Sequence, residues 1–141
     1  MQLDRALLEQ IIAQARAEAP NECCGIIASH AGKAVAVHPA KNAAASPLRY
    51  EMDGMEQYRI QSAIEDAGNE LGAIYHSHTR TAPYPSQTDI NLALTPDGRE
   101  ELWPGTVYVI VGVAGEDPDV RAFAIAAGGR VTEVSLDVQA P

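Results

Sequence analysis

The chain has 141 residues and a formal net charge of −9, and although 46% of its residues are hydrophobic, only one is Phe. This length predicts a single domain over residues 1–141, with a core built mainly from Leu, Ile and Val. The net negative charge argues against nucleic acids and anionic membranes as partners. The longest stretch without a charged residue, 102–115, has 14 residues, whereas about 20 are needed to cross a bilayer.

The N-terminal part of the chain predicts a helix followed by a hairpin. Apolar residues recur at helical spacing over 3–15, and Pro20 ends the pattern. We expect this helix to pack one face on a sheet. The apolar run 24–28 and the alternating run 34–38 flank a turn and therefore predict two paired strands.

The next segment predicts a loop over 41–47, a short strand over 50–52 and a second helix. Asp53 can cap this helix, which extends to about Asn69. Its less regular apolar face consists of Met55, Tyr58, Ser62 and Ile64.

The second half of the chain predicts four strands, over 71–78, 107–113, 120–126 and 130–138. A Pro- and Thr-rich loop and a short helix from Ser86 to about Leu94 separate the first two. Helices placed before and between strands, followed by a run of strands, predict a mixed α/β (α+β) fold with one curved sheet.

The cysteines and the N-terminus predict a cytoplasmic location. Cys23 and Cys24 are adjacent, and a disulfide between neighbours strains the bridge, so we expect two small, buried, reduced side chains. Metal ligation by either cysteine is the less favoured alternative. The first five residues mix acid and base and do not resemble an export signal.

Two of the four histidines, His76 and His78, fall at the end of the predicted strand 71–78. Residues two apart on a strand point to one face about 6.6 Å apart, so both imidazoles can reach one ion at about 2.0–2.1 Å. Ser86 and Asp89 follow on the first turn of the predicted helix and project from the same side. Two histidines and one carboxylate are typical of a catalytic zinc site that leaves its fourth position to water.

Each half of this pattern also has a structural explanation. A His-x-His pair at a strand end is often two ordinary, half-exposed side chains. Ser86 with Asp89 fits a helix start in which the serine is the N-cap. The joint pattern is rare by chance, which favours a metal site able to support hydrolysis.

Glu22, the His-x-His run 76–78, Ser86 and Asp89 together resemble the signature of the JAMM (MPN-plus) zinc metalloprotease family, and the likeness in element order covers most of the chain. The resemblance implies a cytidine-deaminase-like α/β fold, with a curved mixed sheet packed by helices. It implies that one Zn²⁺ per chain is held by His76, His78 and Asp89. It also implies Glu22 as general base and Ser86 as a donor to the tetrahedral intermediate.

Residues 23–25, 75–79 and 84–89 resemble the short bacterial members of this family, of the Mec type. Those proteins look like peptidases that remove cysteine from the C-terminus of a ubiquitin-like sulfur-carrier protein, which implies such a carrier, or its C-terminal adduct, as the partner. The chain is too short for the two insertions of eukaryotic ubiquitin-chain-cleaving members. Cys23 and Pro83 depart from the commoner pattern.

The hypothesis from the sequence is hydrolysis of an amide bond after the C-terminal glycine of a ubiquitin-like protein. Arg80, between the predicted ligands, is a candidate to hold the carboxylate of a released amino acid, or else a solvated loop charge. The alternative function is a zinc-containing binding module for a ubiquitin-like partner, with little or no turnover. A zinc deaminase is disfavoured because neither His-x-Glu nor Pro-Cys-x-x-Cys occurs.

Overall fold

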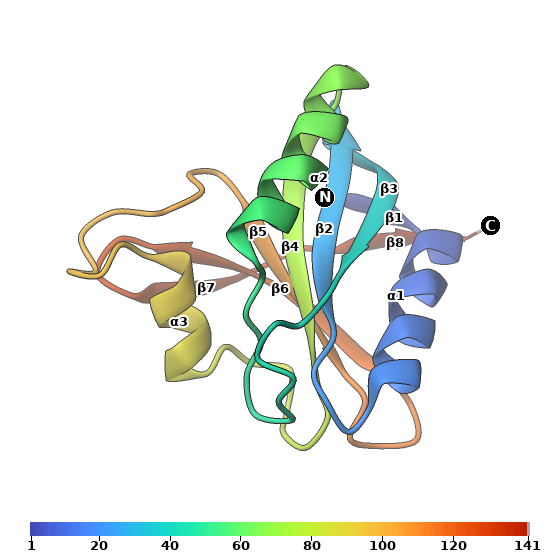
Figure 1. Cartoon of the computed structure of the whole chain (residues 1–141). Coiled ribbons are helices and arrows are strands. Elements are labelled where there is room, and N and C mark those ends of the chain that lie inside the picture. The colour runs from blue at the N-terminus through green and yellow to red at the C-terminus, as the bar shows by residue number, and fades with distance from the viewer. Residues whose placement is uncertain (141) are drawn as a thin grey trace.

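The computed structural model describes residues 1–140 and shows one mixed sheet with the strand order β7-β6-β5-β4-β2-β3-β1-β8. The helices are α1 (Arg5–Glu18), α2 (Gly54–Asp66) and α3 (Gln87–Ala93) (Figure 1). The strands are β1 (Gln2–Asp4), β2 (Cys24–His30), β3 (Lys33–Ala40), β4 (Glu70–His78), β5 (Val107–Gly112), β6 (Asp119–Ala126), β7 (Arg130–Val134) and β8 (Asp137–Gln139). Within this described part, no helix has the length and apolar character of a membrane span.

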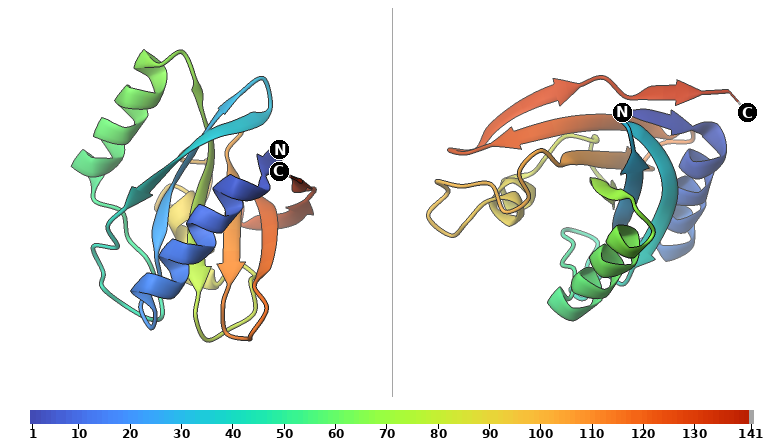
Figure 2. Two further views of the ribbon diagram at one scale, coloured as in Figure 1. Left: turned by 90° about the vertical axis from the view of Figure 1, so that its right-hand side faces the viewer. Right: turned by 90° about the horizontal axis from the view of Figure 1, so that it is seen from above.

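The sheet is strongly curled. β7 and β8 stand at opposite ends of the strand order, although only Ser135 and Leu136 separate them in the chain. The curl is visible when the molecule is seen from above, in the right-hand view of Figure 2. The predicted mixed α/β fold with one curved sheet is confirmed.

The two faces of the sheet carry separate hydrophobic clusters, because side chains alternate along each strand. In β4, Ala73 and Tyr75 pack in the cluster that α1 covers, whereas Ile74 packs in the cluster that contains residues of α2 and α3. The left-hand view of Figure 2 shows α1 in front of the strands and α3 behind them. The expectation that the first helix packs one face on a sheet is confirmed.

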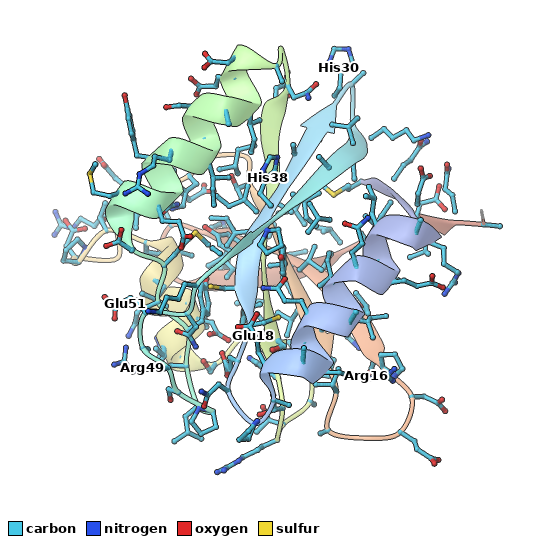
Figure 3. All side chains as sticks on the ribbon, turned by 45° about the vertical axis from the view of Figure 1, so that its right-hand side comes forward. Arg16, Glu18, His30, His38, Arg49 and Glu51 are labelled. Carbon is cyan, nitrogen blue, oxygen red and sulfur yellow. The ribbon has the colours of Figure 1, made fainter. Side chains whose placement is uncertain are left out.

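The predicted hairpin is confirmed as the antiparallel pair β2 and β3. The strands extend further than predicted and are joined at Ala31 and Gly32, both with positive φ, which suits a two-residue turn. His30 lies exposed at the tip of this hairpin (Figure 3).

Three short elements differ from the predictions. Residues 2–4 form β1 rather than the start of a helix, and β1 pairs with β8. Residues 50–52 form no strand, only a single bridge between Met52 and Asn42. The predicted strand 130–138 is divided into β7 and β8, which join different ends of the sheet. These short elements are defined by pairing with residues far away in the sequence, and such pairing leaves no pattern in the local sequence.

The predicted apolar face of α2 is only partly correct. Asp53 caps the helix as expected, because its carboxylate accepts a hydrogen bond from the Glu56 amide. Met55 and Tyr58, however, are 61% and 65% exposed. Ile64 faces the sheet as predicted, together with Ile60, which lies four residues before it and was not predicted.

Candidate metal centre

The end of β4 positions the two histidines. β4 pairs with β2 on one side and β5 on the other, so that His76 lies between Cys24 and Ile110. His76 and His78 point to the same face, and their side chains are buried. Their Nε2 atoms lie 3.1 Å apart. A strand paired on both sides therefore holds both imidazoles in a fixed relation.

The first turn of α3 brings the carboxylate of Asp89 to the same point. Ser86 is the N-cap, and its hydroxyl oxygen accepts a hydrogen bond from the Asp89 amide at 3.1 Å. Asp89 Oδ2 accepts in return from the Ser86 amide at 2.9 Å, which completes a capping box. The same Oδ2 lies 3.1 Å from His76 Nε2 and 3.0 Å from His78 Nε2.

These three atoms fit a shared cation. Ligands at about 2.0–2.1 Å from one tetrahedral ion lie roughly 3.3 Å from one another, close to the separations observed here. His78 Nδ1 lies 2.8 Å from the Ala82 carbonyl oxygen, and donation to that oxygen places the proton of a neutral ring on Nδ1. The Nε2 lone pair of such a ring faces the Asp89 carboxylate, and a shared cation makes this repulsive contact attractive.

The electrostatics of His76 and Asp89 agree with this fit. Burial lowers the pKa of His76 and so favours the neutral form that a metal requires. Burial also opposes charge on His78, but hydrogen bonds to Asp89 and Ala82 outweigh it and raise its pKa, which favours a protonated ring whose Nε2 proton a metal would displace. Burial works against ionisation of Asp89, yet hydrogen bonds from both histidines hold the pKa of this carboxyl well below its usual range.

Glu22 is the fourth polar group at this point. One potential ligand atom from each of Glu22, His76, His78 and Asp89 lies within 4.8 Å of the others. Glu22 is 4% exposed, and its Oε1 has no hydrogen-bond partner. Burial, opposed by the charge of His78 and reinforced by that of Asp89, raises the pKa of Glu22 to about 7. A carboxylate in this state is suited to accept and return a proton near neutral pH.

Contacts between backbone segments place Glu22 beside the histidines. The Ser77 hydroxyl, on the opposite face of β4 from the histidines, accepts from the Cys23 amide at 2.8 Å. The Ser77 amide donates to the Cys23 carbonyl at 3.1 Å. The Thr79 hydroxyl donates to the Pro20 carbonyl at 2.8 Å. The chain around Glu22 is thereby tied to the end of β4.

Ser86 and Arg80 are both exposed, and both line a cavity of about 110 Å³ that also contains Glu22 and His78. The structure thus brings all six residues that the sequence singled out to one end of the sheet. Cys23 and Cys24 are buried and reduced, as expected, and burial raises the pKa of Cys23 to about 11. Neither cysteine joins the metal-binding group found in residues 1–140.

Sequence reasoning missed Tyr50. Its buried ring stacks on the imidazole of His76, with ring centroids 4.3 Å apart and planes 22° apart. His76 Nδ1, on the ring that Tyr50 covers, is buried without a hydrogen-bond partner. Tyr50 lies in an irregular segment that no periodicity marks as part of a site.

The family model described as prokaryotic homologs of the JAB domain matches residues 4–126. A CysO-cysteine peptidase from Mycobacterium tuberculosis is 37% identical over 137 residues, which cover 94% of this chain and 86% of that protein. A desampylase from Haloferax volcanii is 40% identical over 129 residues, with 89% and 84% covered. A probable TtuB-protein conjugate cleaving protease from Thermus thermophilus is 36% identical, with 94% and 80% covered.

Solved structures share the fold. The solution structure of a protein from Desulfitobacterium hafniense superposes with a TM-score of 0.83 at 27% identity and covers 99% of this chain and 93% of its own. A structure described as JAMM, a metalloprotease-like zinc site in the proteasome and signalosome, gives a TM-score of 0.57 at 18% identity, with 99% and 97% covered.

Proposed function

The chain is a metallopeptidase that belongs to the family of prokaryotic homologs of the JAB domain, and we propose that it hydrolyses the amide bond after the C-terminal glycine of a ubiquitin-like protein. The proposed substrate is a sulfur-carrier protein that bears a C-terminal cysteine. The relative named for CysO-cysteine supports release of an amino acid. The two buried, reduced thiols support a cytoplasmic setting.

The proposed metal ligands are His76, His78 and Asp89. The observation that carries this assignment is the convergence of His76 Nε2, His78 Nε2 and Asp89 Oδ2 to within 3.1 Å of one another. The proposed metal is one Zn²⁺ per chain. Bound there, zinc would lower the pKa of a water molecule toward neutrality and polarise a carbonyl oxygen.

Glu22 is proposed as the general base. Its unpartnered Oε1 takes the proton of the attacking water and then delivers it to the nitrogen of the leaving amine. Because burial raises its pKa to about 7, both the accepting and the donating form are populated near neutral pH.

Ser86 is proposed to donate a hydrogen bond to the carbonyl oxygen of the scissile amide as negative charge develops there. Its hydroxyl oxygen already accepts from the Asp89 amide, so the hydroxyl proton points elsewhere and is available to a substrate in the shared cavity. The roles of N-cap and of oxyanion donor, which the sequence presents as alternatives, are therefore compatible.

Arg80 is proposed to bind the carboxylate of the released amino acid. It shares the cavity with Glu22, the residue that protonates the leaving amine, and with the side chains of Thr79 and Thr81. In the described chain no acidic group lies within ion-pair distance of its guanidinium, which leaves its donors free for a bidentate contact.

The test of the function combines metal analysis with mass spectrometry of a Gly-Gly-terminated carrier that bears a C-terminal cysteine. We expect about one zinc per chain and loss of one cysteine mass, neither of which His78→Ala retains. A carrier that associates without losing mass supports the binding-module alternative and contradicts hydrolysis.

The test of Arg80 compares the free acid of the adduct with its C-terminal amide. Arg80→Gln is expected to lower kcat/KM for the acid about 10- to 100-fold, the value of a lost charge-assisted contact, and to leave the amide unaffected. Equal losses on both substrates would contradict carboxylate binding while leaving the peptidase assignment intact.

A further inference from the structure

The buried side-chain amide of Asn42 connects the proposed general base, Glu22, to the segment that carries Tyr50, whose ring stacks on His76. Asn42 is 5% exposed and lies in the irregular segment between β3 and α2. Its Nδ2 donates to the Glu22 carbonyl and to the Arg49 carbonyl, both at 3.0 Å. Its Oδ1 accepts from the Ala44 and Glu51 amides, also at 3.0 Å.

These four bonds use the full capacity of the side chain. A carboxamide has two N–H donors and two acceptor lone pairs, and each has a partner here. A buried, fully satisfied polar group holds its neighbours in one arrangement, since any shift leaves a donor or acceptor unpaired. Asn42 therefore fixes the relation between Glu22 and the segment 44–51.

The bonds to segment 44–51 set the position of Tyr50. The Arg49 carbonyl and the Glu51 amide, both held by Asn42, flank Tyr50 directly. Figure 3 shows the side chains of Arg49 and Glu51 on the outer side of this segment. Tyr50, between them, turns inward and stacks on the ring of His76.

The same segment also holds the other backbone group of Glu22. The Glu22 amide donates to the Ser46 carbonyl at 2.9 Å, while its carbonyl accepts from Asn42. Both backbone groups of the base are thus bound to 42–46, and nothing else in the described chain bonds to them.

From these contacts, and resting on the proposed function, we propose that Asn42 is a positioning residue. It fixes the positions of Glu22 and Tyr50 relative to the proposed metal ligand His76. Asn42 acts through the backbone of Glu22 and has no contact with the reacting atoms. Displacing a catalytic group by about 1 Å can lower the rate about 100-fold. Loss of this positioning is therefore expected to lower kcat and to leave substrate affinity nearly unchanged.

The test uses Asn42→Asp, which keeps the oxygen that accepts from Ala44 and Glu51 but loses both donations. Asn69→Asp is the matched control, because it makes the same change just before the opposite end of β4, where only the backbone amide of Asn69 is hydrogen-bonded within residues 1–140. At saturating zinc and well below the unfolding temperature, Asn42→Asp is expected to lower kcat about 10- to 100-fold and to change KM less than about twofold. Asn69→Asp is expected to match the unsubstituted chain.

A second readout needs neither zinc nor turnover. In metal-free protein labelled with ¹³C and ¹⁵N, the Glu22 carbonyl resonance is expected to shift in Asn42→Asp, whereas the Ala44 and Glu51 amides keep their protection from hydrogen exchange. Asn42→Ala is expected to lose that protection as well. A kcat equal to that of the unsubstituted chain, or an unmoved Glu22 carbonyl, would overturn the proposal.

Failure of the proposed function would look different. An unsubstituted, zinc-loaded chain that cleaves no adduct contradicts hydrolysis, while the Glu22 carbonyl signal still decides whether Asn42 positions this residue. A purely structural role predicts that the kcat of Asn42→Asp recovers fully on cooling, which would also contradict positioning.

Discussion

The two faces of the central sheet differ in chemistry. On the face covered by α1, the core is a continuous cluster of aliphatic side chains, among them Leu8, Ile11 and Val109. On the other face, the apolar packing of α2 and α3 gives way, at the end of β4, to buried Glu22, His76, His78 and Asp89. One face of the sheet therefore stabilises the strands, while the other holds polar groups that are costly to bury.

The division follows from alternation along β4. Tyr75 points toward α1, where its hydroxyl donates to Gln14, while His76 points to the opposite face. Each residue of this strand therefore serves one face only. Substitutions on the face covered by α1 should consequently lower stability and leave activity nearly unchanged, whereas substitutions at the site should lower activity.

The largest expected effect is on catalysis. Glu22→Gln removes the proton acceptor and is expected to lower kcat about 10³-fold, within the range for general acid–base catalysis, while zinc content stays near one per chain. Steady-state assays with metal analysis measure both. Full activity in a zinc-loaded Glu22→Gln variant would exclude Glu22 as the base.

The next effect belongs to the α1 face. Ile11 is fully buried, so Ile11→Ala creates a cavity and is expected to lower the free energy of unfolding by about 2–5 kcal/mol. Activity well below the unfolding temperature should stay within about twofold. Urea unfolding and kinetics on one preparation check this, and a large loss of kcat in the folded variant would show that the faces are not independent.

The stability of the metal-free protein is expected to depend on pH through Glu22. The pKa of Glu22 rises from 4.5 to about 7 on folding, so the fold favours the protonated form. Below pH 4.5 Glu22 is protonated in both the folded and the unfolded chain, so its burial does not lower stability. As the pH rises to 7, Glu22 ionises first in the unfolded chain, and the free energy of unfolding falls by at most about 3 kcal/mol. Glu22→Gln should therefore be more stable than the unsubstituted chain at pH 8 and equal to it at pH 4.

Chemical unfolding in the presence of a chelator, at both pH values, measures this difference. The same substitution is thus expected to lower kcat and to stabilise the metal-free fold above pH 4.5. A variant less stable at pH 8 than the unsubstituted chain would contradict the burial of an ionised Glu22.

The smallest expected effect separates the two roles of Ser86. Ser86→Ala and Ser86→Gly both remove the hydroxyl and are expected to lower kcat about 10²-fold. Alanine is a poor N-cap and should cost about 1 kcal/mol of stability, whereas glycine should cost only a few tenths. Equal kcat losses with unequal melting temperatures support an oxyanion donor, while kcat that follows stability supports capping alone.

Much of the fold could be predicted because long strands and helices leave a local pattern. Apolar runs predicted β2, β4, β5 and β6, and Asp53 and Ser86 marked two helix starts correctly. β1 and β8 have three residues each and exist because they pair with each other, which no local pattern reveals. The predicted apolar face of α2 was wrong at Met55 and Tyr58, because these apolar side chains are exposed.

For the site, spacing within one strand and one helical turn was enough to bring together His76, His78 and Asp89. Glu22 came only from a family resemblance, because it lies more than 50 residues from the histidines and only the pairing of β2 with β4 places it there. Asn42 and Tyr50 could not be found in this way. Their roles arise from hydrogen bonds and stacking within an irregular segment.

Asp89 Oδ2 has a consequence for heat resistance. The same oxygen accepts from the Ser86 amide at the start of α3 and contacts both histidines. α3 has only seven residues, too few for a helix to persist alone, so its first turn depends on the capping box that Asp89 Oδ2 completes. Fraying of this turn withdraws the carboxylate, so thermal inactivation should precede melting of the sheet, and the half-life of the enzyme should track α3 rather than the whole fold.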